Sequence, residues 1–194
     1  YYDVTKGSVK VDGVDVRDMT QKELRDKLGY VPQKGVLFSG TIDSNIRYGK
    51  PEITDAQVKE AAEVAQATEF IDTKPEKYKS PVSQGGTNVS GGQKQRLSIA
   101  RAIAKEPEIF IFDDSFSALD FKTDSQLRKA LKEYTKDATT VIVAQRISTI
   151  LGADQIIVLD DGHMAGIGTH KELMANCEVY QQIARSQLSE EELA

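Results

Sequence analysis

Two short stretches of the sequence carry residue types that could hold a nucleotide and its magnesium ion. The first stretch consists of a serine, two glycines and a glutamine: Ser90, Gly91, Gly92 and Gln93. Serine is a common helix N-cap, and the glycines would let a phosphate approach the free N–H groups of the helix start. The second stretch is the acidic pair Asp113 and Asp114, whose carboxylate oxygens are the ligand type that magnesium prefers. We therefore predict a phosphate site at residues 90–93 and a magnesium site at Asp113.

A helix and a strand are expected to position these two stretches. After Ser90, apolar residues recur with helical spacing until Pro107 prevents continuation of the helix. Residues 109–112 then form a continuous apolar run, as expected of a central parallel strand that is covered on both faces. Ligands bind at the carboxyl ends of such strands, which is where Asp113 and Asp114 follow.

The order of these motifs is similar to that of an ABC-transporter ATPase domain. Residues 88–93 resemble its signature motif, residues 109–114 its Walker B strand, and residues 117–120 its D-loop. The resemblance implies an α/β fold: a P-loop NTPase (RecA-like) core with a mostly parallel sheet, truncated at its N-terminus, plus an inserted helical subdomain. It also implies ATP and Mg²⁺ as cofactors. The implied nucleotide contacts in these motifs are Ser90, Gly91, Gly92, Gln93 and Asp120.

The segment before the signature extends this resemblance. Gln33 follows a predicted strand and Pro32, and it resembles the Q-loop glutamine. In the family this residue helps to coordinate magnesium and senses the transmembrane domain. Gln33 is therefore implied as a nucleotide contact and, with Asp113, as a metal ligand. Residues 36–49 are similar to the exporter version of this region, where a cytoplasmic helix of the transmembrane domain docks.

The resemblance and the local patterns together divide the chain into three segments. Residues 1–34 are expected to form the N-terminal part of the ATPase core, from a β hairpin to the Q-loop. Residues 35–89 are expected to form the helical subdomain. Residues 90–194 are expected to hold the signature helix, Walker B, the D-loop, the switch segment and C-terminal helices.

Local signals define the elements within these segments. Thr20 and Thr54 are predicted helix N-caps, because each is followed three residues later by a residue that completes a capping box. The other expected elements are a hairpin at residues 8–16, buried strands at 139–144 and 155–159, and a tail of one or two amphipathic helices at 171–193.

Two departures from the family pattern concern hydrolysis. Hydrolytic members have glutamate after the Walker B aspartate, whereas Asp114 is one methylene shorter. The switch segment normally carries histidine where this chain has Gln145, which can donate to a phosphate but cannot change charge near neutral pH. A general base is worth roughly 10²–10⁴-fold, and displacing a group by about 1 Å can cost on the order of 10²-fold. The residues at catalytic positions, Asp114 and Gln145, thus imply a slow site.

Loss of both groups resembles the degenerate subunit of a heterodimeric ABC exporter. In such pairs each nucleotide lies between the Walker motifs of one subunit and the signature of the other. The implied partners are a second, non-identical ABC ATPase domain and the transmembrane domain of an exporter, in the same full-length chain. The implied location is the cytoplasmic face of the cell membrane. The intact signature at residues 90–93 would complete the partner's active site.

The composition restricts the class of partner. The 194 residues include 25 Lys plus Arg and 30 Asp plus Glu, which gives a net charge of −5, and no basic block supports nucleic acid as a partner. The single cysteine, Cys177, excludes an internal disulfide framework. No apolar run approaches the roughly 18 residues needed to cross a membrane.

The sequence contains no Gly-x-x-x-x-Gly-Lys-[Ser/Thr] loop, which would supply the N–H cradle and the lysine for the phosphates. We expect the chain to begin just after that loop, and as given to be inactive and to lack tight ATP binding. Two alternatives stay open: a non-transport ABC ATPase that acts on nucleic acid or ribosomes, and a nucleotide-free interaction module. The transported substrate stays open among drugs, lipids and peptides.

Overall fold

A computed structural model describes residues 3–189, while residues 1–2 and 190–194 lie outside the described part. The chain divides into two units, with the boundary between Val141 and Ile142. No helix within residues 3–189 is long and apolar enough to span a bilayer.

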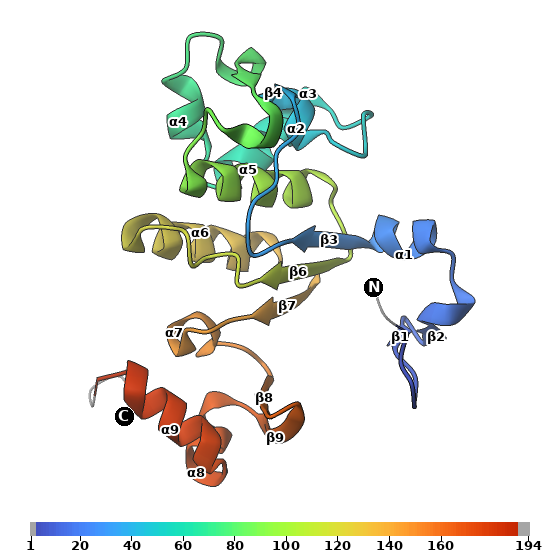
Figure 1. Cartoon of the computed structure of the whole chain (residues 1–194), viewed down its shortest axis with the longest axis vertical. Coiled ribbons are helices and arrows are strands. Elements are labelled where there is room, and N and C mark those ends of the chain that lie inside the picture. The colour runs from blue at the N-terminus through green and yellow to red at the C-terminus, as the bar shows by residue number, and fades with distance from the viewer. Residues whose placement is uncertain (1–2, 190–194) are drawn as a thin grey trace. The chain divides into compact units, whose positions relative to one another are not determined.

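A parallel pair of strands forms the centre of the first unit (Figure 1). Strands β3 (Leu28–Val31) and β6 (Ile109–Asp113) pair in parallel, so their carboxyl ends lie at the same edge. Strand β7 (Thr139–Val143), which crosses the unit boundary, follows β6 in the order β3-β6-β7. The parallel pairing confirms the sheet type predicted from the apolar run at residues 109–112.

Two 14-residue helices accompany this sheet, α5 (Gly91–Ala104) and α6 (Phe121–Tyr134). Helix α5 packs against β3 and also against the helices that follow the Q-loop. Figure 1 shows part of that helical segment, α2 and α4 with β4, at the top, beyond α5. The other elements of this unit are β1 (Lys10–Val11), β2 (Val14–Asp15), α1 (Gln21–Lys27), β4 (Gly40–Thr41), α2 (Ile42–Ile46), α3 (Asp55–Val64), α4 (Thr68–Asp72), β5 (Pro81–Val82) and 3₁₀ turns at Val16–Asp18, Lys77–Lys79 and Gln84–Gly86.

The predicted helix starts agree with the structure. Thr20 and Thr54 each accept a hydrogen bond from the backbone three residues on, and the third residue bonds back to complete the box. The predicted hairpin forms as β1 and β2, with Val11 opposite Val14. These agreements arise because caps and tight turns depend on residues only a few positions apart.

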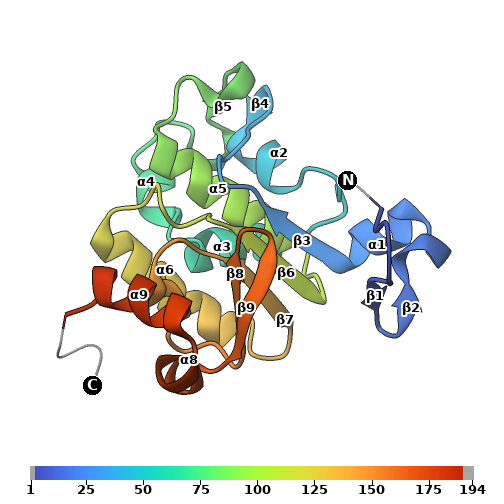
Figure 2. The same cartoon turned by 60° about the horizontal axis from the view of Figure 1, so that its bottom comes forward.

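The second unit is a β hairpin packed on two helices (Figure 2). Its elements are α7 (Ile147–Ile150), β8 (Ile156–Asp160), β9 (His163–Gly168), α8 (His170–Asn176) and α9 (Glu178–Gln187), with β8 and β9 antiparallel. The predicted helical tail at residues 171–193 is therefore found as α8 and α9, and residues 190–193 lie outside the described part. Alternate residues of β8 join the buried cluster: Ile156 and Val158 pack with Leu173, Tyr180 and Ala184.

Two strands are less buried than the sequence predicted. The apolar residues of β7 suggested burial, but Val141 is 46% exposed. In β8, Ile157 and Leu159 are 57% and 67% exposed, because successive side chains of a strand point to opposite faces and only one face meets the helices. The prediction of buried strands was therefore wrong for β7 and for one face of β8, since apolar composition alone does not show whether a second layer covers a strand.

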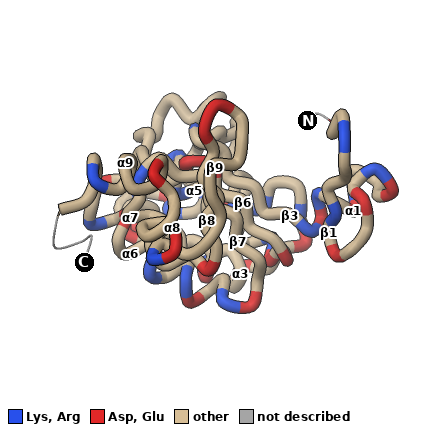
Figure 3. The backbone as a smooth tube through the Cα atoms, turned by 90° about the horizontal axis from the view of Figure 1, so that it is seen from below, with Lys and Arg blue, Asp and Glu red and all other residues tan. Residues whose placement is uncertain are grey.

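Charged residues are interspersed along the described chain. Figure 3 shows basic and acidic positions alternating over the backbone. Nucleic-acid-binding domains gather Lys and Arg on one face or stripe. The interspersed charges agree with the absence of a basic block in the sequence.

Candidate functional site

The predicted magnesium residue and its neighbours meet at the carboxyl edge of the β3–β6 pair. Gln33, two residues after the end of β3, donates from Nε2 to Oδ2 of Asp114 at 3.1 Å. The Tyr30 hydroxyl donates to Oδ2 of Asp113, also at 3.1 Å. The structure thus brings Gln33, Asp113 and Asp114 together, as their positions after parallel strands predict.

The turn after β6 fixes the direction of the acidic pair. Asp114 has φ of 43°, in the left-handed region that non-glycine residues rarely occupy and that recurs at functional sites. Its carbonyl accepts from the Ser117 hydroxyl at 3.0 Å. The buried Ser115 hydroxyl donates to the carbonyl of Val31 at 2.8 Å and so ties this turn to β3. The orientation of Asp114 is therefore supported from both strands.

Helix α5 contacts the Q-loop at Pro32 and Gly35. Gln95 is 1% exposed and donates from Nε2 to the carbonyl of Pro32 at 3.0 Å. Gly35 lies so close to α5 that a Cβ on it would be 2.8 Å from the carbonyl of Lys94. Sequence reasoning missed both residues, although a glutamine four residues before the buried Ile99 was a detectable signal of a buried amide.

The signature residues form the predicted helix start. Ser90 accepts from the N–H of Gln93 at 3.2 Å, and Gln93 Oε1 accepts from the N–H of Ser90 at the same distance. A Cβ on Gly91 would meet no atom within 4 Å, so this side of the helix start is open. A Cβ on Gly92 would lie 3.5 Å from the carbonyl of Ala118, which places the signature beside the predicted D-loop. The Gln93 side chain serves the cap, so its predicted contact with nucleotide stays a prediction.

Asp120 begins helix α6. Its carboxylate accepts from the N–H of Thr123 at 3.0 Å and from the Thr123 hydroxyl at 2.7 Å. The backbone hydrogen bond, followed by the hydroxyl bond, lowers the pKa of Asp120. Asp120 is thus an ordinary N-cap in this structure, and its predicted role toward a nucleotide stays a prediction.

The exporter-like segment at residues 36–49 folds around a partly buried arginine that sequence reasoning missed. Arg101 of α5 donates from Nε to the carbonyl of Asn45 at 2.7 Å and from Nη1 to that of Val36 at 2.9 Å. Burial lowers its pKa to about 10. Above it the rings of Phe38 and Tyr48 stack with centroids 4.0 Å apart, and both remain exposed. This segment therefore presents a fixed aromatic surface.

The switch segment lies in the second unit and is held through its backbone. The carbonyl of Gln145 accepts from Nε2 of Gln187 at 2.9 Å, and Oε1 of Gln187 accepts from the N–H of Ile147 at 2.8 Å. His170, which the sequence analysis had not assigned to chemistry, pairs through Nδ1 with the Tyr180 hydroxyl at 2.8 Å.

The side chains at the strand edge fit a magnesium ion that is bound together with a nucleotide. Within residues 3–189 no three His, Cys, Asp or Glu side chains converge as a self-sufficient metal site. Magnesium does not need such a cluster, because one or two carboxylates with phosphates and waters suffice. Asp113, with the Gln33 amide nearby, fits that requirement.

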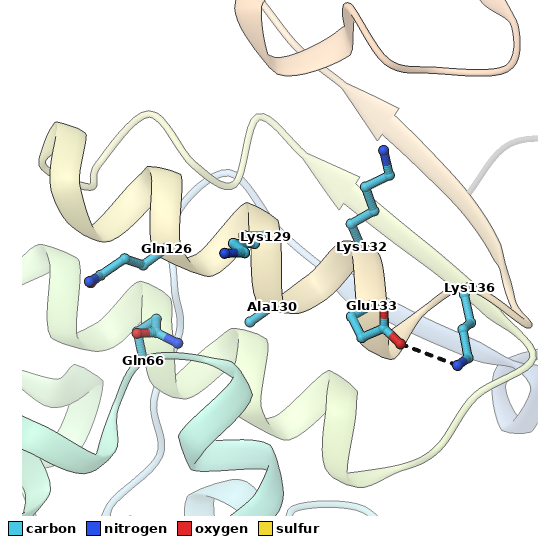
Figure 4. A pocket seen from close by; sticks show the side chains of 7 residues that line it. All are labelled: Gln66, Gln126, Lys129, Ala130, Lys132, Glu133 and Lys136. Atoms are coloured by element: carbon cyan, nitrogen blue, oxygen red, sulfur yellow. Dashed lines mark hydrogen bonds and ion pairs between the residues drawn. The ribbon is translucent and has the colours of Figure 1, made fainter.

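An open pocket of about 720 Å³ lies elsewhere on the first unit (Figure 4). Helix α6 supplies most of its lining, including Lys129 and Lys132, and Gln66 faces it from the helical segment. None of the predicted site residues lines this pocket. It is therefore distinct from the strand edge described above.

Comparison with known proteins agrees with the motifs. The family model described as ABC transporter matches residues 1–117. An uncharacterized ABC transporter ATP-binding protein of Mycobacterium tuberculosis is 48% identical over 189 residues, covering 96% of this chain and 32% of the relative. A Staphylococcus aureus protein, provisionally named multidrug export ATP-binding/permease protein, is 45% identical over 183 residues, covering 94% of this chain and 32% of the relative.

A solved structure agrees with the fold. A bacterial Atm1-family ABC exporter with ATP bound matches with a TM-score of 0.93 and 39% identity, covering 97% of this chain and 33% of that chain. The chain spans about a third of the length of these relatives. The resemblance recognised in the motifs is confirmed: this chain belongs to the ABC transporter family and has the P-loop NTPase fold of an ABC exporter's nucleotide-binding domain.

Proposed function

We propose that this chain is the ATP-binding domain of an ABC exporter, in which ATP binding and hydrolysis drive export of a drug-like or lipid substrate. We further propose that it is the hydrolysis-impaired half of a heterodimer at the cytoplasmic face of the membrane. The observation that carries the proposal is the group at the strand edge, where Gln33 bonds to Asp114 beside Asp113. The position of the family's glutamate base is occupied there by the shorter Asp114.

The residues of the chain would divide the work as follows. Asp113 and Gln33 would hold magnesium, which neutralises phosphate charge when bound. Asp114 would face the attacking water from a position one methylene too far back, and Gln145 would donate to a phosphate without taking up a proton. The start of α5, which is open beside Gly91, would face the nucleotide of the partner domain. Binding of two ATP would close the paired domains, and hydrolysis at the partner's site would reopen them.

The exporter hypothesis has more support than the alternatives. The exposed Phe38–Tyr48 stack, held over Arg101, offers an apolar surface to a helix of the transmembrane domain. The Staphylococcus aureus relative carries export in its provisional name. A domain that acts on nucleic acid would be expected to show a basic face, whereas the charges here are interspersed.

The test uses the full heterodimeric exporter with Asp114→Glu and Gln145→His in this chain. Restoring both groups should raise ATP turnover at this site on the order of 10²-fold, because each supplies an atom where the family has it. A matched control is Asp160→Glu with Gln182→His, at exposed positions of the second unit. If neither turnover nor trapping of nucleotide at this site rises, the proposed impairment is refuted. If the unmodified domain retains no ATP at all, the binding function is refuted as well.

A further inference from the structure

Gln187, the last residue of α9, holds the switch segment with both ends of its side-chain amide. Its Oε1 accepts from the N–H of Ile147 at 2.8 Å, and its Nε2 donates to the carbonyl of Gln145 at 2.9 Å. The two hydrogen bonds lie on either side of Arg146. A side-chain amide accepts through its oxygen and donates through its nitrogen, so it can fix a backbone segment at two points.

The first of these bonds fills a need of the local fold. Ile147 is the first residue of α7, and the first N–H groups of a helix have no acceptor within it. The helix has no side-chain cap of its own, because Arg146 stands at its N-cap position without a capping hydrogen bond. The Gln187 oxygen therefore supplies from another helix the acceptor that a Ser or Thr cap usually provides.

Apolar packing also holds the start of α7 against α9. Ile147 and Leu188 both belong to the buried cluster of the second unit, together with Tyr180 and Ala184 of α9. Gln187, which makes the hydrogen bonds, directly precedes the buried Leu188, and Ile147 takes part in both the hydrogen bonding and the buried cluster. The C-terminal helix α9 and the residue after it therefore hold residues 145–147 by hydrogen bonds and by apolar packing.

We propose that Gln187 is a positioning residue of the nucleotide site: it fixes the backbone from which the Gln145 side chain extends toward a phosphate. This rests on the proposed function of Gln145. Freeing the backbone would let Gln145 shift, and a shift of about 1 Å in a positioned group costs on the order of 10²-fold at most. The C-terminal helix thereby becomes part of the machinery that retains ATP.

The test compares variants of the full exporter. Gln187→Met removes both hydrogen bonds but keeps the length and helix propensity of the side chain. We expect amide hydrogen exchange at Ile147 to accelerate about tenfold and ATP to leave this site about tenfold faster, while retention at the partner's site is unchanged. Gln182→Met is the matched control, since in the described part of the chain the Gln182 side chain bonds within α9, to Glu178. It should alter neither quantity.

Gln187→Glu separates the two bonds. A carboxylate still accepts from Ile147 but cannot donate to the Gln145 carbonyl. Exchange at Ile147 should stay close to that of the unmodified exporter, and ATP release should fall between the unmodified exporter and Gln187→Met. Release equal to that of the unmodified exporter would show that the Gln145 bond is not needed, which overturns the proposal.

The remaining outcomes are distinct. If amide exchange at Ile147 is unchanged in Gln187→Met, the Gln187 hydrogen bonds do not hold the backbone of residues 145–147. If exchange is faster but ATP release is unchanged, only the positioning role is refuted. If the unmodified exporter retains no ATP at this site, the proposed function fails, and with it the role of Gln187.

Discussion

Asp114 and Gln145, the two residues that we propose at catalytic positions, are held in opposite ways. At the end of β6 in the first unit, the side chain of Asp114 is fixed, because its Oδ2 accepts from Gln33 at 3.1 Å. In the second unit it is the backbone of Gln145 that is fixed, because its carbonyl accepts from Gln187 at 2.9 Å. The hydrogen bond to Asp114 fixes the direction of its carboxylate. The hydrogen bond to Gln145 fixes only its backbone and leaves the direction of its side chain free.

Under the proposed function, this difference means that the impaired hydrolysis would have two physical origins. At Asp114 the decisive quantity is the length of a side chain whose direction is already set. At Gln145 the decisive property is the chemistry of the side chain, because its backbone is already fixed. Substitutions that test side-chain length, side-chain chemistry, loop support and protonation should therefore affect the two regions unequally.

The largest effect is expected at the neighbour of Asp114. Asp113→Asn removes the carboxylate assigned to magnesium, so magnesium-dependent retention of ATP at this site should fall on the order of 10²-fold or more in the full exporter. Retention can be measured with a photoreactive ATP analogue that labels this domain. Asp137→Asn, at an exposed position of the same unit, is the matched control. Retention that survives Asp113→Asn would remove the magnesium role and with it the contrast between the regions.

The next effect distinguishes the length of the Asp114 side chain from the chemistry of the Gln145 side chain. Asp114→Glu alone should raise single-turnover hydrolysis at this site about tenfold or more, because the extended carboxylate approaches the water. Gln145→His alone should raise it less, because the water would still lack a well-placed base. A larger gain from Gln145→His than from Asp114→Glu would reverse the comparison and make the switch the limiting group.

Local motifs were predictable because their chemistry is local. The capping boxes at Thr20, Thr54 and Ser90 use partners three residues away, and their sequence patterns predicted the observed helix starts. The strand edge was predictable because Asp113 and Gln33 each follow an apolar run in a motif of known order. Family order and strand direction together place them at one edge.

The distant partners of the supporting residues were not predictable from such patterns. Gln95 bonds to Pro32 across 63 positions, Arg101 to Asn45 across 56, and Gln187 to Gln145 across 42. No periodicity in a single sequence encodes which distant carbonyl an amide or guanidinium will meet. The exposure of β7 and β8 escaped prediction for the same reason, since covering layers come from elsewhere in the chain.

A smaller effect should come from the loop that aims Gln33. Gly35→Ala places a Cβ 2.8 Å from the Lys94 carbonyl, so the Q-loop must move off α5 or strain it. Such overpacking costs about 1–3 kcal/mol, seen as faster local hydrogen exchange at residues 33–36. Gly152→Ala is the control, because a Cβ there meets nothing within 4 Å. Equal behaviour of the two variants would show that the loop tolerates displacement.

The smallest effect should be produced by pH at two helix caps, one in each unit. Hydrogen bonds from the backbone N–H and then the hydroxyl of a threonine lower the pKa of Asp120 and of Glu172. Because the folded pKa lies below the unfolded value, each cap stabilises its helix above the unfolded pKa. That stabilisation is lost as pH falls through the folded pKa. Both carboxylates are solvent-screened, so the loss should be slight.

Hydrogen-exchange protection of the first turns of α6 and α8, corrected for intrinsic pH dependence, measures this loss between roughly pH 5 and pH 2, because both pKa values are lowered from their ordinary values. Glu172→Gln keeps an acceptor for the Thr169 N–H but does not titrate, so protection of α8 should become independent of pH while that of α6 still declines. A decline in α8 that persists in Glu172→Gln would mean that another acid controls the second unit. Because α8 packs against α9, acid could then loosen the support of Gln145 without acting on Asp114 at all.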